Sequence, residues 1–89
     1  MNRTEAIAIL NHHLDSLEAL GYVALARQIG EDQAFERRGD SGTDYQLELS
    51  ILWDRHPNGS IRIVGSIDDG GLGAFLPLTD SRLMEPEGS

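Results

Sequence analysis

Apolar and polar residues alternate along two neighbouring stretches in the middle of the chain, residues 45–54 and 61–68. In both stretches the apolar residues occupy odd-numbered positions: Tyr45, Leu47, Leu49, Ile51 and Trp53 in the first, and Ile61, Ile63 and Ile67 in the second. A period of two residues is typical of strands that bury one face. The sequence therefore predicts a β-hairpin with a buried odd-numbered face.

The turn between these strands determines which residues face each other. A two-residue loop of Asn58 and Gly59 would put the two apolar rows on opposite faces of the sheet, so the pattern argues against it. A three-residue loop keeps the rows together, with Pro57 and Asn58 at the centre of a type I turn and Gly59 in the left-handed bulge position. This register predicts three facing pairs: Trp53 with Ile63, Leu49 with Ile67, and Asp54 with Arg62.

Helical spacing of apolar residues predicts an N-terminal helix. Thr4 is the expected N-cap, and Gly21 is the expected end. The expected buried stripe is Ile7, Leu10, Leu14 and Leu17, widened on one flank by Ala6, His13 and Leu20. Residues 22–30 carry a shorter apolar pattern, which favours a second helix and leaves a strand as the alternative.

Two further strands are predicted on either side of the hairpin. Residues 35–39 form the first, because Asp40, Ser41 and Gly42 repeat the three-residue turn chemistry. This turn predicts two facing pairs: Phe35 with Leu47, and Arg38 with Asp44.

The fourth strand is placed at residues 74–76, after a loop of Asp69, Gly70 and Gly71. Phe75 would then cover the bare backbone of Gly65. Pro77 cannot donate to a strand ladder, so this strand belongs at an edge or ends there.

Together these elements predict an α+β fold. An N-terminal helix and a short second helix pack on one face of a three- to four-stranded antiparallel meander sheet. Residues 1–84 form one domain, and residues 85–89 form a flexible tail.

Composition excludes several classes of function. Seven basic and fifteen acidic residues give a formal net charge of −8 over 89 residues, which disfavours nucleic acid and anionic membranes as partners. The chain has no cysteine, so disulfides, thiolate zinc sites and a cysteine nucleophile are ruled out. The sequence shows no apolar run of membrane-span length and no secretory signal pattern, so a cytoplasmic location is expected.

The predicted register also leaves apolar residues on the even-numbered face, where polar residues are expected. Such a patch often marks an interaction site, so we predict a partner-binding surface there. The apolar row and the carboxylates around it are Leu52, Val64 and Leu76, with Glu48, Asp54 and Asp68. Either a second chain covers the row, or Leu83 and Met84 do.

Metal binding is weakly indicated by the histidines. His12 and His13 are adjacent in a helix, so their side chains point about 100° apart and cannot hold one metal together. His56 precedes a turn proline, and the sequence does not bring it near the other two. No metal or cofactor is therefore predicted.

Asp68, Asp69 and Asp80 are the candidates for a hard-cation site or an acid-base pair. The competing interpretation is turn chemistry, because aspartate before two glycines is typical of turns and the spacing matches no calcium loop. No serine stands in a nucleophile elbow, and no catalytic residue is identified, so an enzyme is the minority interpretation.

The segment GSIDDGGLGAFLPLTDS, residues 65–81, resembles the C-terminal segment of small uncharacterised bacterial proteins of unknown function. The likeness covers about the last quarter of the chain. It implies a bacterial origin and imports no functional residue.

Two functional hypotheses follow. The leading one is a small acidic protein-binding module with a basic partner, of the class to which toxin-neutralising immunity proteins belong, or a homodimer. The alternative is a small-ligand or metal-dependent enzyme that uses the region of Asp68, Asp69 and Asp80.

Overall fold

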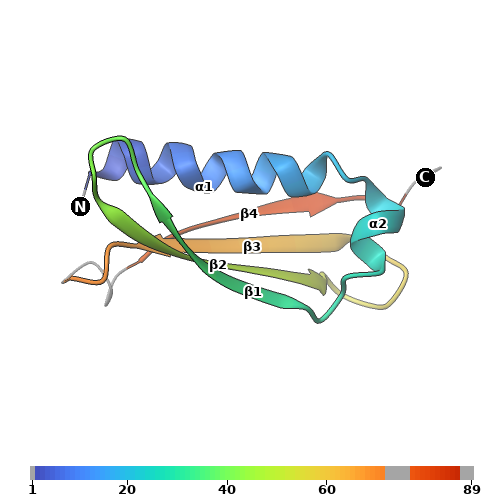
Figure 1. Ribbon diagram of the computed structural model, residues 1–89. Coiled ribbons are helices and arrows are strands. Elements are labelled where there is room, and N and C mark those ends of the chain that lie inside the picture. The colour runs from blue at the N-terminus through green and yellow to red at the C-terminus, as the bar shows by residue number, and fades with distance from the viewer. Residues whose placement is uncertain (1, 72–76, 87–89) are drawn as a thin grey trace.

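Two helices precede four strands in the computed structural model, which describes residues 2–71 and 77–86. The elements are α1 (Arg3–Glu18), α2 (Tyr22–Ala26), β1 (Asp32–Arg38), β2 (Asp44–Trp53), β3 (Ile61–Asp68) and β4 (Leu78–Met84). Figure 1 shows α1 lying along one face of the sheet, with α2 at one end. The predicted α+β fold is confirmed, and the segment after Gly21 begins as a helix.

The sheet is an antiparallel meander in the order β1-β2-β3-β4, so β1 and β4 are its edges. The predicted register of the first hairpin is confirmed, because Phe35 pairs with Leu47 and Arg38 pairs with Asp44. Arg38 Nε donates a 2.9 Å hydrogen bond to Asp44 Oδ1 across the two strands.

The predicted register of β2 on β3 was wrong by two residues. Trp53 pairs with Ile61 rather than Ile63, and the N–H of Asp54 donates to the carbonyl of Ser60 across a loop of residues 55–59. Because the register differs by two residues, an even number, every side chain keeps its predicted face. The pairs expected for Leu49 and Asp54 are replaced by Leu49 with Gly65 and Leu52 with Arg62.

The turn chemistry of this loop also differs from the prediction. Asn58 has the positive φ, 67°, and Gly59 does not. The N–H of Gly59 donates to the carbonyl of His56, so Pro57 and Asn58 occupy the central positions of a turn with the positive φ second, as in type II. Gly59 is buried, and its carbonyl accepts a 2.8 Å hydrogen bond from the hydroxyl of Tyr22 in α2.

The described fourth strand lies after Pro77, not before it. Its ladder runs from Leu78 opposite Ile67 to Met84 opposite Ile61. The strand predicted at residues 74–76 falls outside the described residues. A proline just before a strand needs no ladder hydrogen bond, which is why Pro77 is compatible with β4 starting at the next residue.

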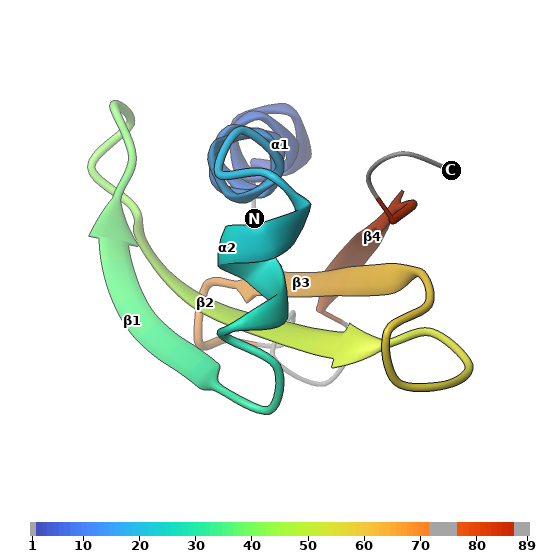
Figure 2. The ribbon, with the colours of Figure 1, turned by 90° about the vertical axis from the view of Figure 1, so that its right-hand side faces the viewer.

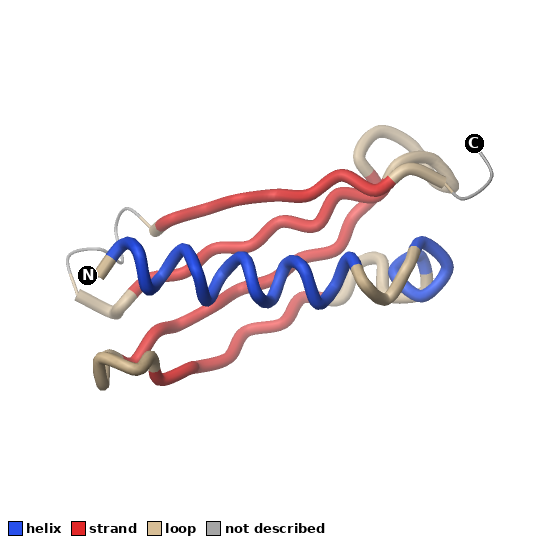
Figure 3. Tube along the Cα trace, turned by 90° about the horizontal axis from the view of Figure 1, so that it is seen from above, coloured by secondary structure: helices blue, strands red, loops and turns tan. Residues whose placement is uncertain are grey.

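The core lies between α1 and the odd-numbered face of β2 and β3, as predicted. In Figure 3 α1 runs along the strands, and its contacts fall mainly on β3 and β4. The buried apolar residues are Ala6, Ile9, Leu10, Leu14, Leu17, Leu25, Tyr45, Leu47, Leu49, Ile51, Ile61, Ile63 and Ile67. Burying an aliphatic side chain of this size stabilises by roughly 1.5 to 3 kcal/mol, before the entropy cost is subtracted.

Two details of the first helix differ from the prediction. Asn2 is the N-cap, because its side-chain oxygen accepts a 3.0 Å hydrogen bond from the N–H of Glu5, and Thr4 lies inside the helix. The buried stripe includes Ile9, whereas Ile7 is 43% exposed. Both isoleucines fit helical spacing, so sequence alone did not separate them.

A polar contact on the α1 side also holds β4 in place. The guanidinium of Arg82 donates to Asp15 Oδ1 at 2.9 Å, Glu18 Oε1 at 3.0 Å and Asn11 Oδ1 at 2.9 Å. These three acceptors lie on α1, so Arg82 ties the edge strand to the helix.

Candidate interaction surface

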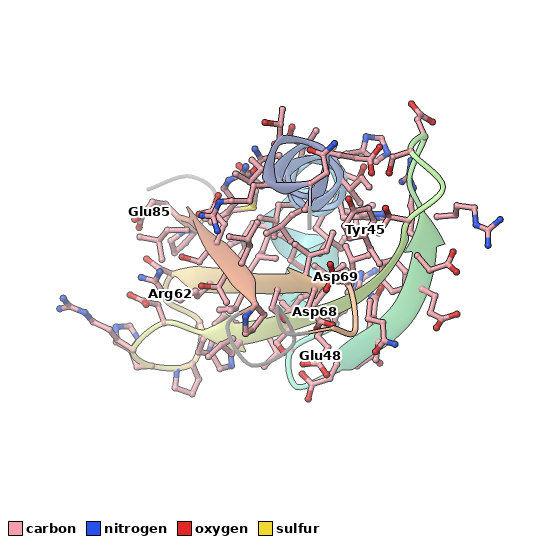
Figure 4. The ribbon with its side chains drawn as sticks, turned by 90° about the vertical axis from the view of Figure 1, so that its left-hand side faces the viewer. Tyr45, Glu48, Arg62, Asp68, Asp69 and Glu85 are labelled. Atoms are coloured by element: carbon pink, nitrogen blue, oxygen red, sulfur yellow. The ribbon has the colours of Figure 1, made fainter. Side chains whose placement is uncertain are left out.

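One face of the sheet points away from α1 and α2, and we call it the open face. It comprises the even-numbered residues of β1, β2 and β3 and the odd-numbered residues of β4, because the β3–β4 register pairs even with odd. Figure 2 shows both helices on the other side of the sheet. In Figure 4 Glu48 lies on the open face, and Tyr45, from the same strand, lies on the helix side.

One end of the open face is apolar. Leu52 is 40% exposed and Leu83 is 46% exposed, and both are paired with Arg62 on the strand between them. Val64 lies one row further along, between Ser50 and Ser81. These three apolar residues, Leu52, Val64 and Leu83, form what we call the apolar end.

The apolar end differs in membership from the row predicted by sequence. Leu52 and Val64 lie on the open face as expected, and Leu76 falls outside the described residues. Leu83 does not cover the row from a tail but belongs to it as part of β4. Met84 pairs with Ile61 on the helix side and packs against the core.

Arg62 separates the two exposed leucines, and its charge is compensated. Its Nε donates a 2.8 Å hydrogen bond to Asp54 Oδ1, and its Nη1 donates a 3.1 Å bond to Ser81 Oγ. Asp54 thus meets Arg62 as predicted, although as a diagonal neighbour rather than a facing one. The aliphatic stem of the arginine extends the apolar end.

The other end of the open face is acidic. Glu48 pairs with Ala34 on one side and Ser66 on the other, and Gln46 lies between Glu36 and Asp68. We call Glu36, Glu48 and Asp68 the acidic end, and Asp32 lies on the edge strand opposite Ser50, in the same row as Val64. Across residues 2–71 and 77–86, none of these four carboxylates forms an ion pair.

The basic residues of the open face do not neutralise the acidic end. Arg38 is paired with Asp44, and Arg62 is paired with Asp54. The ion pair of Arg38 holds the pKa of the Asp44 carboxyl below its ordinary value. The acidic end therefore keeps its charge available to a partner.

The aspartates of the enzyme hypothesis do not form one site. Asp68 and Asp69 each accept a hydrogen bond from the N–H two residues on, at Gly70 (2.8 Å) and Gly71 (3.1 Å). Asp80 lies on the helix side of the sheet, opposite Gly65. Within the described ranges, no group of three or more acidic or histidine side chains is placed to hold a metal ion.

The histidines are likewise dispersed. The rings of His12 and His13 are 5.4 Å apart, and the ring of His13 makes an edge contact with Phe35 at 5.0 Å. Burial lowers the pKa of His13, and the nearby Arg37 lowers it further. His56 lies in the β2–β3 loop, with Nδ1 3.2 Å from the carbonyl oxygen of Pro57.

A polar cluster that sequence reasoning missed joins the β1–β2 turn to α1. Glu5 Oε1 accepts hydrogen bonds from Ser41 Oγ at 2.6 Å and from the hydroxyl of Tyr45 at 2.8 Å. Glu5 Oε2 accepts from the N–H of Ser41 at 2.9 Å. The bonds from Ser41 and then Tyr45 lower the pKa of Glu5, while burial raises the pKa of Tyr45. The carboxylate is held as an acceptor, so the cluster anchors the turn.

Sequence reasoning also missed Leu83 and the β1 carboxylates Asp32 and Glu36. The sequence does contain an indication for Leu83: Leu78 and Met84 occupy even-numbered positions and Leu83 an odd-numbered one, so in a strand Leu83 lies on the opposite face from the other two. The strand predicted at residues 74–76 ends before Leu83 and so leaves it out. The β1 carboxylates could be assigned to the open face from the correctly predicted pairing of Phe35 with Leu47.

No family model, no curated protein and no solved structure matches the chain. Neither described helix is long and apolar enough to cross a membrane.

Proposed function

We propose that this protein is a non-catalytic protein-binding module and that the open face of its sheet binds a basic partner. The observation that carries the proposal is the division of this face into an exposed apolar end and an acidic end without ion pairs. Leu52 and Leu83 offer apolar area that a partner would remove from water. The carboxylates select for positive charge and speed association.

Charge favours a different protein over a second copy of this chain. The net charge of −8 makes two copies repel each other, and the described arginines of the open face are already ion-paired. A basic partner instead meets unpaired carboxylates. Small size and acidity are features that the chain shares with toxin-neutralising immunity proteins as a class, and they support a role of that kind.

The proposal is tested by capture of proteins from the native extract on the immobilised parent and on two matched variants. Leu52→Glu adds a charge at the apolar end, at a residue that is 40% exposed. Ile7→Glu makes the same change on α1, at a residue that is 43% exposed, and serves as the control.

We expect a basic protein to be captured by the parent and by Ile7→Glu and lost from Leu52→Glu. Circular dichroism should show all three proteins folded, because both sites are exposed. If Leu52→Glu captures the same proteins in the same amounts, the open face is not the binding surface.

A further inference from the structure

We infer that the open face recognises a helix whose apolar and basic residues are separated along its length, not interleaved. This inference rests on the proposed function and specifies the partner's binding element. It follows from where the strand register puts the apolar end relative to the acidic end.

The two ends are separated along the strands. Leu52 and Glu48 are four residues apart on β2, and Val64 and Asp68 are four residues apart on β3. A strand rises about 3.3 Å per residue, so Leu52 lies about 13 Å from Glu48 along β2, and Val64 lies about 13 Å from Asp68 along β3. Because Ser50 pairs with Val64 and Gln46 pairs with Asp68, the step from apolar residue to carboxylate points in the same direction along the sheet on both strands.

The two ends are offset by one strand across the sheet. The apolar end spans β2 to β4, from Leu52 to Leu83, whereas the acidic end spans β1 to β3, from Glu36 to Asp68. A partner that reaches both ends must therefore run along the strands on a slight diagonal.

A helix suits this layout better than an added strand. A sheet face presents side chains rather than free backbone groups, and the usual second layer on such a face is a helix, as α1 is on the other face. A helix rises about 1.5 Å per residue, so 13 Å corresponds to about nine residues. The partner helix thus carries leucine-like residues near one end and Lys or Arg about eight residues further along, because eight is the nearest spacing that keeps both on one face.

Three synthetic helical peptides of about 18 residues test this inference. The first has leucines on one face at one end and lysines on that face at the other. The second has the same composition with leucines and lysines interleaved on the face. The third has the pattern of the first with glutamate in place of lysine. Affinities for the full chain are measured by titration calorimetry at about 0.1 M salt.

We expect the first peptide to bind about tenfold more tightly than the second, and the third not to bind. Leu52→Glu and the pair Glu48→Gln with Asp68→Asn should each weaken the first peptide about tenfold, and Ile7→Glu should not. Leu83→Glu, also at an exposed site, should repeat the result of Leu52→Glu. Equal binding of the first two peptides, or equal loss with Ile7→Glu, overturns the inference.

The outcome separates this inference from the proposed function. If Leu52→Glu abolishes capture of the native partner while the first two peptides bind equally, the open face is the binding surface, but the inference of a helix with separated apolar and basic residues is wrong. If Leu52→Glu leaves capture unchanged, the proposed function itself is wrong.

Discussion

The hydroxyl of Tyr45 donates a 2.8 Å hydrogen bond to Glu5 Oε1, which joins the start of β2 to the first turn of α1. Together with the bonds from Ser41, it holds the pKa of Glu5 below the ordinary value of 4.5. A carboxylate with a lowered folded pKa adds stability that is present above its unfolded pKa. This stability is lost as the pH falls through the folded value.

We therefore predict that Glu5→Gln reduces the pH dependence of stability. The free energy of unfolding of the parent should exceed that of the variant near neutral pH, and the difference should shrink as the pH falls from about 5 to about 3. Urea unfolding at a series of pH values measures it. The ion pair of Arg38 and Asp44 is present in both proteins, so its own pH dependence cancels in the difference between their free energies of unfolding. A difference that stays constant down to pH 3 would show that the ionised form of Glu5 is not preferred.

Gly65 allows α1 to approach β3. A β carbon at this position would lie 2.8 Å from Leu10 Cδ1 and 3.2 Å from Leu14 Cδ2. Gly65→Ala should therefore destabilise by about 1 to 3 kcal/mol through overpacking, measured by urea unfolding. Gly71→Ala is the control, because the nearest atom there is Asp69 Oδ1 at 3.5 Å. If the two changes lowered the free energy of unfolding equally, close packing of α1 against Gly65 would be contradicted.

Asn58 adopts the left-handed conformation in the β2–β3 loop, with a φ of 67°. Asn58→Ala should lower the free energy of unfolding by about 1 kcal/mol, because the short polar side chain of asparagine can hydrogen-bond locally in this conformation and the alanine methyl group cannot. Asn58→Gly should be close to neutral, because glycine adopts it freely. Denaturation midpoints of the three proteins decide the matter. If the alanine and glycine variants behave alike, the positive φ is not at this residue.

The Asp-Gly turn after β3 is predicted to be structural. Asp68 and Asp69 each use a carboxylate oxygen to accept a backbone hydrogen bond. The thermal midpoint of the parent should therefore not rise with added calcium, since binding to the native state would raise it. The double variant Asp68→Asn with Asp69→Asn should respond in the same way. A calcium-dependent rise that only the parent shows would establish a cation site.

The faces of the sheet could be predicted from sequence, but parts of its register could not. Alternation at Leu47, Leu49 and Ile51 determines which side is buried, and hydrophobic burial enforces it. A shift of two residues leaves that pattern unchanged, so alternation cannot distinguish Ile61 from Ile63 as the partner of Trp53. That choice depends on the loop, where Asn58 rather than Gly59 takes the positive φ.

The candidate surface was predictable in outline for the same reason. Leu52 and Val64 follow from the faces alone, whereas Leu83 depends on where β4 begins. Pro77 predicts a strand that lies at an edge or ends there, although a strand can equally begin just after a proline. Nor could sequence show that Leu10 and Leu14 approach Gly65, because this contact depends on how α1 crosses the sheet.

The most direct test of the central claim is methyl chemical-shift mapping of the labelled protein on addition of its captured basic partner. The methyl groups of Leu52, Val64 and Leu83 should shift or broaden, because they form the apolar end of the open face. Those of Ile7 and Val23, which are 43% and 51% exposed on the helices, should not. Changes confined to the helices, with Leu52, Val64 and Leu83 unaffected, would contradict the assignment of the open face as the binding surface.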